Sequence, residues 1–251
     1  MLKKFLIYVF LFIGMTYNLY AKKISVNYEA RFGILGKVGA IYNTIDIKNG
    51  RYTIDTTLKL YGIAKMLLGN QKEHYISKGR VIDGLFLPDF YSMSTIKKHK
   101  RMLKEYHFKH KTHKLVRIKK KWRDGKLISD EKKIVKFYAK DDLLTLYFNM
   151  DEHIKVHKNQ YKFILNVAGL ERQKGKVTIN VATPKDIKNY KDDLGSSTSW
   201  YAKAHIVQKS FKNKSGDILL SVSKDGYIQK AVIKDLVMYG DAVLNRIESR
   251  R

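Results

Sequence analysis

Cysteine is absent from the 251 residues of this chain, and proline occurs only twice, at positions 88 and 184. Without cysteine there is no disulfide framework, no thiolate metal site and no cysteine nucleophile. The two prolines and the lack of low-complexity stretches leave no sign of a flexible linker. Because 44% of the residues are hydrophobic and 29% are charged, the chain can bury a substantial core. We therefore expect a single folded domain over residues 22–251.

Acidic residues are also scarce. The chain has 23 Asp and Glu against 50 Lys and Arg, which gives a formal net charge of +27. Most of the basic residues are lysines, whereas proteins that bind phosphate groups specifically favour the planar fork of arginine. Lysines spread along the whole chain predict a salt-screened attraction to anionic surfaces, and no specific nucleic-acid partner.

The N-terminus carries the one long apolar run. Lys3 and Lys4 precede an apolar stretch from Phe5 to Met15, and Ala21 stands before Lys22. A basic start, a short apolar stretch and a small residue are typical of a secretory signal peptide. We expect residues 1–21 to be this peptide, cleaved after Ala21, with the mature protein in the periplasm. The alternative is an uncleaved inner-membrane anchor, for which this segment has about the minimum length.

Strict alternation of apolar and polar residues predicts β-strands. It runs from Ile24 to Phe32, and again on both sides of Asn49-Gly50, a dipeptide typical of a two-residue hairpin turn. With that turn, we expect one face of the hairpin to hold three apolar pairs: Ile47 with Tyr52, Ile45 with Ile54, and Ile41 with Leu58.

The most basic stretch, residues 97–123, is predicted to form another hairpin, with its tip at Lys111-Thr112-His113. In that register Phe108 pairs with Val116, Tyr106 with Ile118 and Met102 with Trp122, all on one apolar face. The opposite face is expected to be a solvated basic face. Its basic residues are Lys109, Arg117, Lys119, Lys121 and Arg123.

The rest of the chain predicts more strands and few helices. Shorter alternating stretches occur at 161–167, 177–181, 218–222, 231–233 and 242–247. A helix is expected over residues 141–150, with Asp141 and Asp142 as acidic caps ahead of a run that is apolar nearly all round and hence buried. A second helix is expected from Thr183-Pro184 to Gly195, and a helical turn at 63–68. The fold class is mainly β: an open antiparallel barrel or strongly curved sheet of about ten strands, with two or three short helices.

The order of these elements resembles a bacterial family of exported proteins, the domain-of-unknown-function family number 3108. The stretches that carry the resemblance are YEARFGILGKVGA (28–40), LYGIAKMLLG (60–69), GRVIDGLFLPDFY (79–91), DDLLTLYF (141–148) and residues 219–248. The resemblance implies an exported protein with an open barrel similar to that of periplasmic lipoprotein carriers. The family has no assigned reaction, so it implies no catalytic residues.

Residues with reactive side chains show no catalytic or metal-binding pattern. His99, His107, His110 and His113 do not converge on a strand pair. The adjacent acids Asp141 and Asp142 are unsuited to opposed acid–base roles, and their position favours helix capping. We expect no catalytic residues, no metal site and no cofactor, and hence a protein that is not an enzyme.

Aromatic and aliphatic side chains on the predicted inward faces suggest two alternatives. They either fill a core or line a cavity for an acyl chain or another apolar ligand. The helix at 141–150 decides between them, because it either fills the curve of the sheet or only caps it. The candidate lining residues are Tyr28, Phe32, Tyr52, Tyr106, Phe108, Trp122, Leu146 and Phe148.

The predicted function is that of a non-enzymatic envelope protein that binds or carries a lipid-like ligand. A second possibility is an electrostatic docking protein that uses the basic face on lipopolysaccharide or anionic membrane.

Overall fold

A computed structural model describes residues 21–67, 70–157, 160–170, 172–196, 198–206, 216–234 and 241–247. Residues 1–20, which hold most of the predicted signal peptide, lie outside the described residues.

All described strands belong to one sheet, which is antiparallel except for its last pair. Strands β1 to β8 follow one another as a meander, and so do β10 to β15; the two meanders join where β15 pairs with β1. The strands are β1 (Lys22–Phe32), β2 (Lys37–Lys48), β3 (Arg51–Leu60), β4 (Lys72–Ile82), β5 (Leu85–Lys97), β6 (Lys100–Lys109), β7 (Lys114–Arg123), β8 (Lys126–Ile134), β9 (Asp141–Asp142), β10 (Lys162–Ala168), β11 (Lys176–Val181), β12 (Trp200–Ile206), β13 (Asp217–Val222), β14 (Ile228–Ile233) and β15 (Ala242–Ile247).

The mainly β, open and curled architecture is confirmed, but the prediction of about ten strands was too low. Fifteen strands form the described sheet. The missed strands include β8, whose residues are almost all exposed on both faces. Alternation in a sequence reports a strand with one buried face, so a strand that buries neither face gives no such signal.

The predicted register of the first hairpin is confirmed. Ile47 pairs with Tyr52, Ile45 with Ile54, and Ile41 with Leu58. Asn49 and Gly50 have φ angles of 53° and 68°, as a tight hairpin turn of this kind requires.

The predicted register of the basic hairpin was wrong by one residue. Its tip is a four-residue turn, the 3-10 turn η2 (His110–Thr112) followed by His113 with a φ of 49°, so Lys109 pairs with Lys114. A shift of one residue turns every side chain of a strand to the other face. Arg117, Lys119, Lys121 and Arg123 therefore share the inward face of Tyr106 and Phe108, and only Lys109 keeps its outward position. The predicted basic face does not exist as one surface.

The inward position of Arg117 is stabilised by an ion pair. Its side chain is buried, with the residue 4% exposed, and a guanidinium nitrogen lies 2.6 Å from a carboxylate oxygen of Glu131 on β8. A buried arginine needs such a partner, because an uncompensated charge is costly away from water.

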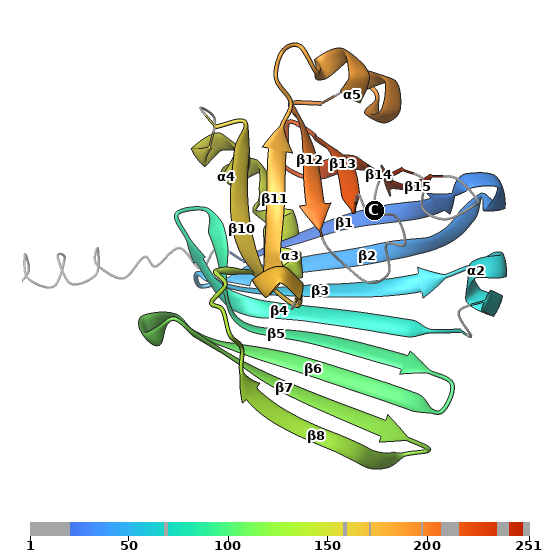
Figure 1. The fold of residues 1–251 in the computed structure, drawn as a ribbon, viewed down its shortest axis with the longest axis vertical. Coiled ribbons are helices and arrows are strands. Elements are labelled where there is room, and N and C mark those ends of the chain that lie inside the picture. Colours follow the sequence, from blue (N-terminus) through green and yellow to red (C-terminus); the bar gives the residue numbers. More distant parts are fainter. Residues whose placement is uncertain are drawn as a thin grey trace, which may run out of the picture.

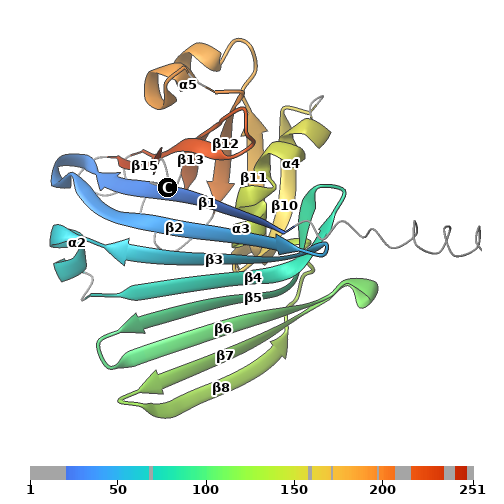
Figure 2. The same cartoon turned by 180° about the vertical axis from the view of Figure 1, so that it is seen from behind.

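The two meanders form the two halves of the molecule. In Figure 1, β10–β13 cross steeply over the end of the flatter β1–β8 half, and Figure 2 shows the same arrangement from behind. Each half buries its own cluster of apolar side chains. The hydroxyl of Tyr28 on β1 donates a hydrogen bond of 2.8 Å to the carbonyl oxygen of Ile228 on β14, which ties the halves together.

Helices are few and short. They are α2 (Gly62–Leu67), α3 (Leu143–Phe148), α4 (Met150–Val156) and α5 (Ile187–Leu194), with 3-10 turns η1 (Gly33–Leu35) and η3 (Arg172–Gly175). α3 is buried, as predicted, and α5 ends at Gly195, as predicted. The predicted start of α5 at Thr183 was wrong. The Thr183 hydroxyl donates instead to the carboxylate of Asp186, 2.6 Å away, and this local turn delays the helix to Ile187.

Candidate apolar ligand site

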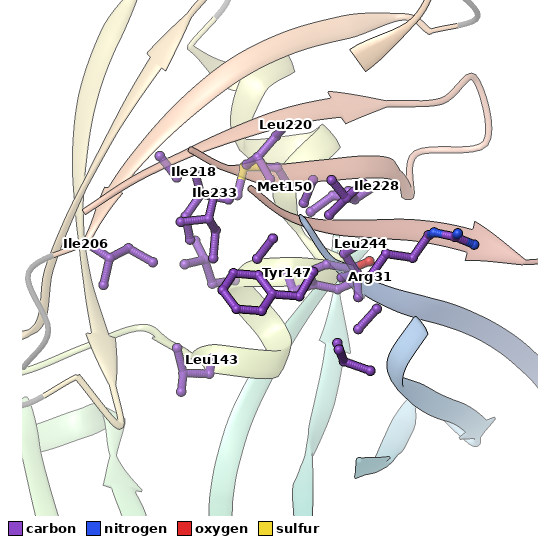
Figure 3. A pocket seen from close by; sticks show the side chains of 18 of the residues that line it. Arg31, Leu143, Tyr147, Met150, Ile206, Ile218, Leu220, Ile228, Ile233 and Leu244 are labelled. Atoms are coloured by element: carbon purple, nitrogen blue, oxygen red, sulfur yellow. The ribbon is translucent and has the colours of Figure 1, made fainter. Parts of the chain in front are cut away.

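A large apolar cavity lies between the two halves of the sheet. Its volume is about 790 Å³, it is partly open to solvent, and almost all of its lining is apolar. Figure 3 shows Tyr147 at its centre, with the guanidinium of Arg31 pointing away at one side. The lining residues are Ala30, Arg31, Phe32, Leu35, Val38, Leu60, Ala64, Leu143, Leu146, Tyr147, Met150, Val177, Ala204, Ile206, Ile218, Leu220, Ile228, Ala231, Ile233, Ala242, Val243 and Leu244.

The helix α3 both fills the curve of the sheet and leaves this cavity beside it. Leu144 and Phe148 pack into the core cluster of the β1–β8 half. Leu143, Leu146 and Tyr147 line the cavity, and Leu143 and Tyr147 also pack against that cluster. Successive residues of a helix point in different directions, so one short helix can serve both the core and the cavity wall.

A hydrogen-bonded carboxyl group holds the start of α3. Asp142 is fully buried, and its side chain accepts hydrogen bonds from the backbone N–H groups of Leu144 (2.8 Å) and Thr145 (3.0 Å). It also accepts one from the Ser77 hydroxyl at 2.6 Å, and the Ser77 oxygen lies 3.0 Å from the hydroxyl oxygen of Tyr52. Burial raises the pKa of the Asp142 carboxyl to about 7, because the charged form loses its hydration.

Asp141 supports α4 in a similar way. Its carboxylate accepts hydrogen bonds from Asn149 at 2.9 Å and lies 3.1 Å from Nε2 of His153. The amide of Asn149 also bonds both backbone groups of Phe86 on β5. The expected capping role is confirmed for Asp142 at the start of α3. It was wrong for Asp141, whose carboxylate contacts the side chains of Asn149 and His153 instead of the start of a helix.

A second, smaller cavity adjoins the first. It measures about 290 Å³ and shares Leu143, Tyr147 and Leu244 with the large cavity. Its wall includes Tyr91, whose buried hydroxyl has no hydrogen-bond partner among the described residues. Burial raises the pKa of this hydroxyl well above its usual range, so it stays protonated and keeps a hydrogen to donate.

The predicted lining residues fall into three groups. Phe32 and Leu146 line the large cavity, and Tyr28 lines the small one. Four others are buried in the core cluster of the β1–β8 half and line neither cavity. They are Tyr52, Tyr106, Phe108 and Phe148.

Trp122, the last predicted lining residue, neither lines a cavity nor belongs to the core cluster. Because of the shifted register it pairs with Arg101 rather than with Met102, and it faces outward. The Arg101 guanidinium lies 4.8 Å from the centre of its ring, a distance typical of a cation–π contact.

Most of the cavity wall was missed because it comes from β12–β15 and from Tyr147. The alternation of Ile218, Leu220 and Val222 correctly indicated a strand, yet an alternating pattern gives no information on whether its buried face meets a packed core or an empty space. The inward positions Ile218, Leu220, Ile228, Ala231 and Ile233 are all aliphatic, and this was the available signal.

The histidines of the basic hairpin lie at both ends of the sheet, and His110 and His113 both contact the ring of Tyr138. His99 is 3.4 Å from Asp124 at one end of the sheet, whereas His110 lies at the other end, 2.5 Å from the Tyr138 hydroxyl and 2.7 Å from the Pro88 carbonyl. Within the described ranges no three His, Asp or Glu side chains are grouped as a metal site would require. No helix in the same ranges is long and apolar enough to cross a membrane.

Comparison with known proteins gives little further information. No family model matches the chain, and no curated protein matches it. Among solved structures it is similar to one described as a β-barrel-like protein of the domain of unknown function DUF1849 from Brucella abortus. The likeness covers 91% of this chain and 95% of the other, at 11% identity and a TM-score of 0.46. Likeness at this level carries no argument, and the resemblance to family 3108 stays a prediction.

Proposed function

We propose that this protein is an exported binding module without catalytic activity, which carries an apolar, chain-like ligand in the cavity between its two half-sheets. The observation that carries the proposal is the cavity itself, about 790 Å³ with an almost entirely aliphatic wall. Ligand pockets in proteins measure about 300–1,000 Å³. Each methylene transferred from water into such a site gains about 0.8 kcal/mol, so an acyl chain is the simplest ligand class that fits.

Uptake of a fluorescent fatty acid by the purified protein tests this function. Ala204 on β12 and Ala231 on β14 are small residues in the cavity wall. Replacing either with phenylalanine puts a ring into the space that the ligand needs. We expect Ala204→Phe to lower the affinity for the fatty acid roughly tenfold or more, because the ring displaces about two methylenes of the ligand from the cavity.

Ile164→Phe on β10 is the matched control, because Ile164 is exposed and lies outside the cavity wall. Its uptake should equal that of the unaltered chain, and circular dichroism should show that all variants are folded. Ala231→Phe serves as the second variant if Ala204→Phe unfolds. The proposal would be contradicted if the unaltered chain showed no saturable uptake. It would also be contradicted if both cavity variants folded and took up the fatty acid as well as the unaltered chain.

Export is part of the proposal and has its own test. Lys3 and Lys4, the apolar stretch after them and Ala21 support cleavage before Lys22. Sequencing the N-terminus of the protein isolated from its own cells should start at Lys22. Recovery of the uncut chain in the inner-membrane fraction would favour the anchor instead.

Electrostatic docking on lipopolysaccharide or anionic lipid is the second candidate function. The observation that favours it is the net charge of +27, which attracts the protein to anionic surfaces. The basic hairpin is a poor choice for that contact, because Arg117 is buried and its basic neighbours point to two different faces.

A further inference from the structure

One end of the sheet brings exposed apolar side chains next to the large cavity. This end, called the portal end here, consists of η1, α2 and the turns that join β5 to β6 and β7 to β8. Both views of the molecule place η1 and α2 next to each other, at the tips of β1–β3 (Figures 1 and 2). Phe32, Leu35, Val38, Leu60 and Ala64 extend the cavity wall to this end.

Two aliphatic side chains project from the portal end into solvent. Ile34 on η1 is 88% exposed and Met66 on α2 is 74% exposed. Ile96, at the end of β5, is 43% exposed. Single exposed apolar residues are common, but these three come from consecutive strand connections at one end of the sheet, and two of them flank the cavity.

Positive charge surrounds these apolar tips. Nine exposed basic residues besides Arg31 lie at the portal end, against the acids Glu29, Glu73, Asp124 and Asp241. Glu29 is already paired, 3.1 Å from Arg31 and 2.7 Å from Lys37. The nine are Lys37, Lys65, Lys72, Lys97, Lys98, Lys100, Arg101, Arg123 and Lys126. Trp122 lies under Arg101 at the same end, and tryptophan is enriched where proteins meet the membrane–water interface.

We propose that the portal end docks on an anionic lipid bilayer, with Ile34 and Met66 entering the interface and the surrounding lysines contacting the head groups. This deepens the proposed carrier function and rests on it. A ligand chain then moves between the bilayer and the cavity past Phe32, Leu35 and Ala64 without crossing bulk water. A bilayer fits better than a protein partner, because cations around apolar tips match the anionic head groups and acyl chains of lipid.

The absence of native cysteine allows a site-specific test in the full chain. Ile34→Cys, Met66→Cys and Ile164→Cys are each labelled with an environment-sensitive fluorophore and mixed with vesicles. We expect a blue shift and quenching by brominated lipid for the labels at 34 and 66, with phosphatidylglycerol mixed into phosphatidylcholine. The label at 164, on β10 away from the portal end, should not respond. Equal responses at 34 and 164, or no response at 34 and 66, would overturn the proposal.

Charge variants test the basic surround separately. Each lysine near an anionic surface raises affinity by roughly fivefold, so Lys65→Gln with Lys72→Gln should weaken vesicle binding by about 25-fold. The control removes two exposed lysines from the opposite end of the sheet, Lys111→Gln with Lys114→Gln, and should leave binding near its original value. A larger loss in the control pair would assign docking to the hairpin tip and contradict the portal end.

The two proposals can fail independently. Uptake of dissolved fatty acid without vesicles reports on the cavity alone. If uptake is saturable and docking fails, the carrier function stands and the portal proposal falls. If docking occurs and uptake fails, the carrier function falls, and with it the passage of ligand through the portal end.

Discussion

The variant Phe148→Ala should have a free energy of unfolding about 3–5 kcal/mol lower than that of the unaltered chain. Phe148 is buried on α3. The centre of its ring lies 4.9 Å from the ring centre of Tyr147 and 6.0 Å from that of Tyr227. Tyr227 comes from the turn between β13 and β14, so this contact joins the helix to the second half of the molecule. Removing the ring leaves an internal void that its rigid neighbours cannot close.

Urea unfolding followed by circular dichroism measures this loss. Ile134→Ala on the edge strand β8 is the control, because Ile134 is 60% exposed and its truncation should cost about 0.5 kcal/mol or less. A similar small cost for Phe148→Ala would mean that α3 is not held inside the curve of the sheet. The cavity wall that depends on Leu143, Leu146 and Tyr147 would then be in doubt as well.

The second large effect is a change in the pH dependence of stability on replacing Asp142. Its pKa is about 7 in the fold, against a usual value of 3.8. A carboxyl whose pKa is raised by folding binds its proton more tightly in the native state. The contribution of Asp142 to the free energy of unfolding is therefore greatest below pH 4, falls as pH rises toward 7, and is constant above pH 7. The difference between the two pKa values corresponds to a loss of about 4 kcal/mol in the free energy of unfolding over this pH range.

Asp142→Asn should abolish this part of the pH dependence. The amide is nearly the same shape, its oxygen can accept from Leu144 and Thr145, and its NH₂ group can donate to Ser77, so the cap is kept without a charge. We expect the variant to be more stable than the unaltered chain at pH 8 and close to it at pH 4. Urea unfolding at both pH values measures the difference.

Asp130→Asn is the control for this experiment, because Asp130 is exposed on β8 and caps no helix. It should keep the pH dependence of the unaltered chain. An Asp142→Asn variant that loses as much stability between pH 4 and pH 8 as the unaltered chain would show that other groups cause the change.

Local pattern was enough to predict much of the sheet. Strict alternation predicted β1–β3, and the Asn49-Gly50 turn set the register of β2 with β3, because two residues with positive φ leave one possible pairing. The same reasoning failed for the basic hairpin. A three-residue and a four-residue tip both suit Lys111-Thr112-His113, and the burial of Arg117 against Glu131 is a contact with a third strand that the hairpin pattern does not contain.

The sequence by itself determined that this is a mainly β protein with few helices, and that the helix after Asp142 is buried. Only the tertiary structure decided that space remains beside that helix. The wall of that space combines β1–β3 with β12–β15, strands far apart in the chain that the β1–β15 pairing brings together. Alternation shows which side chains share a face of a strand. Whether two such faces meet in close packing or stand apart depends on how the sheet curls, which no local pattern encodes.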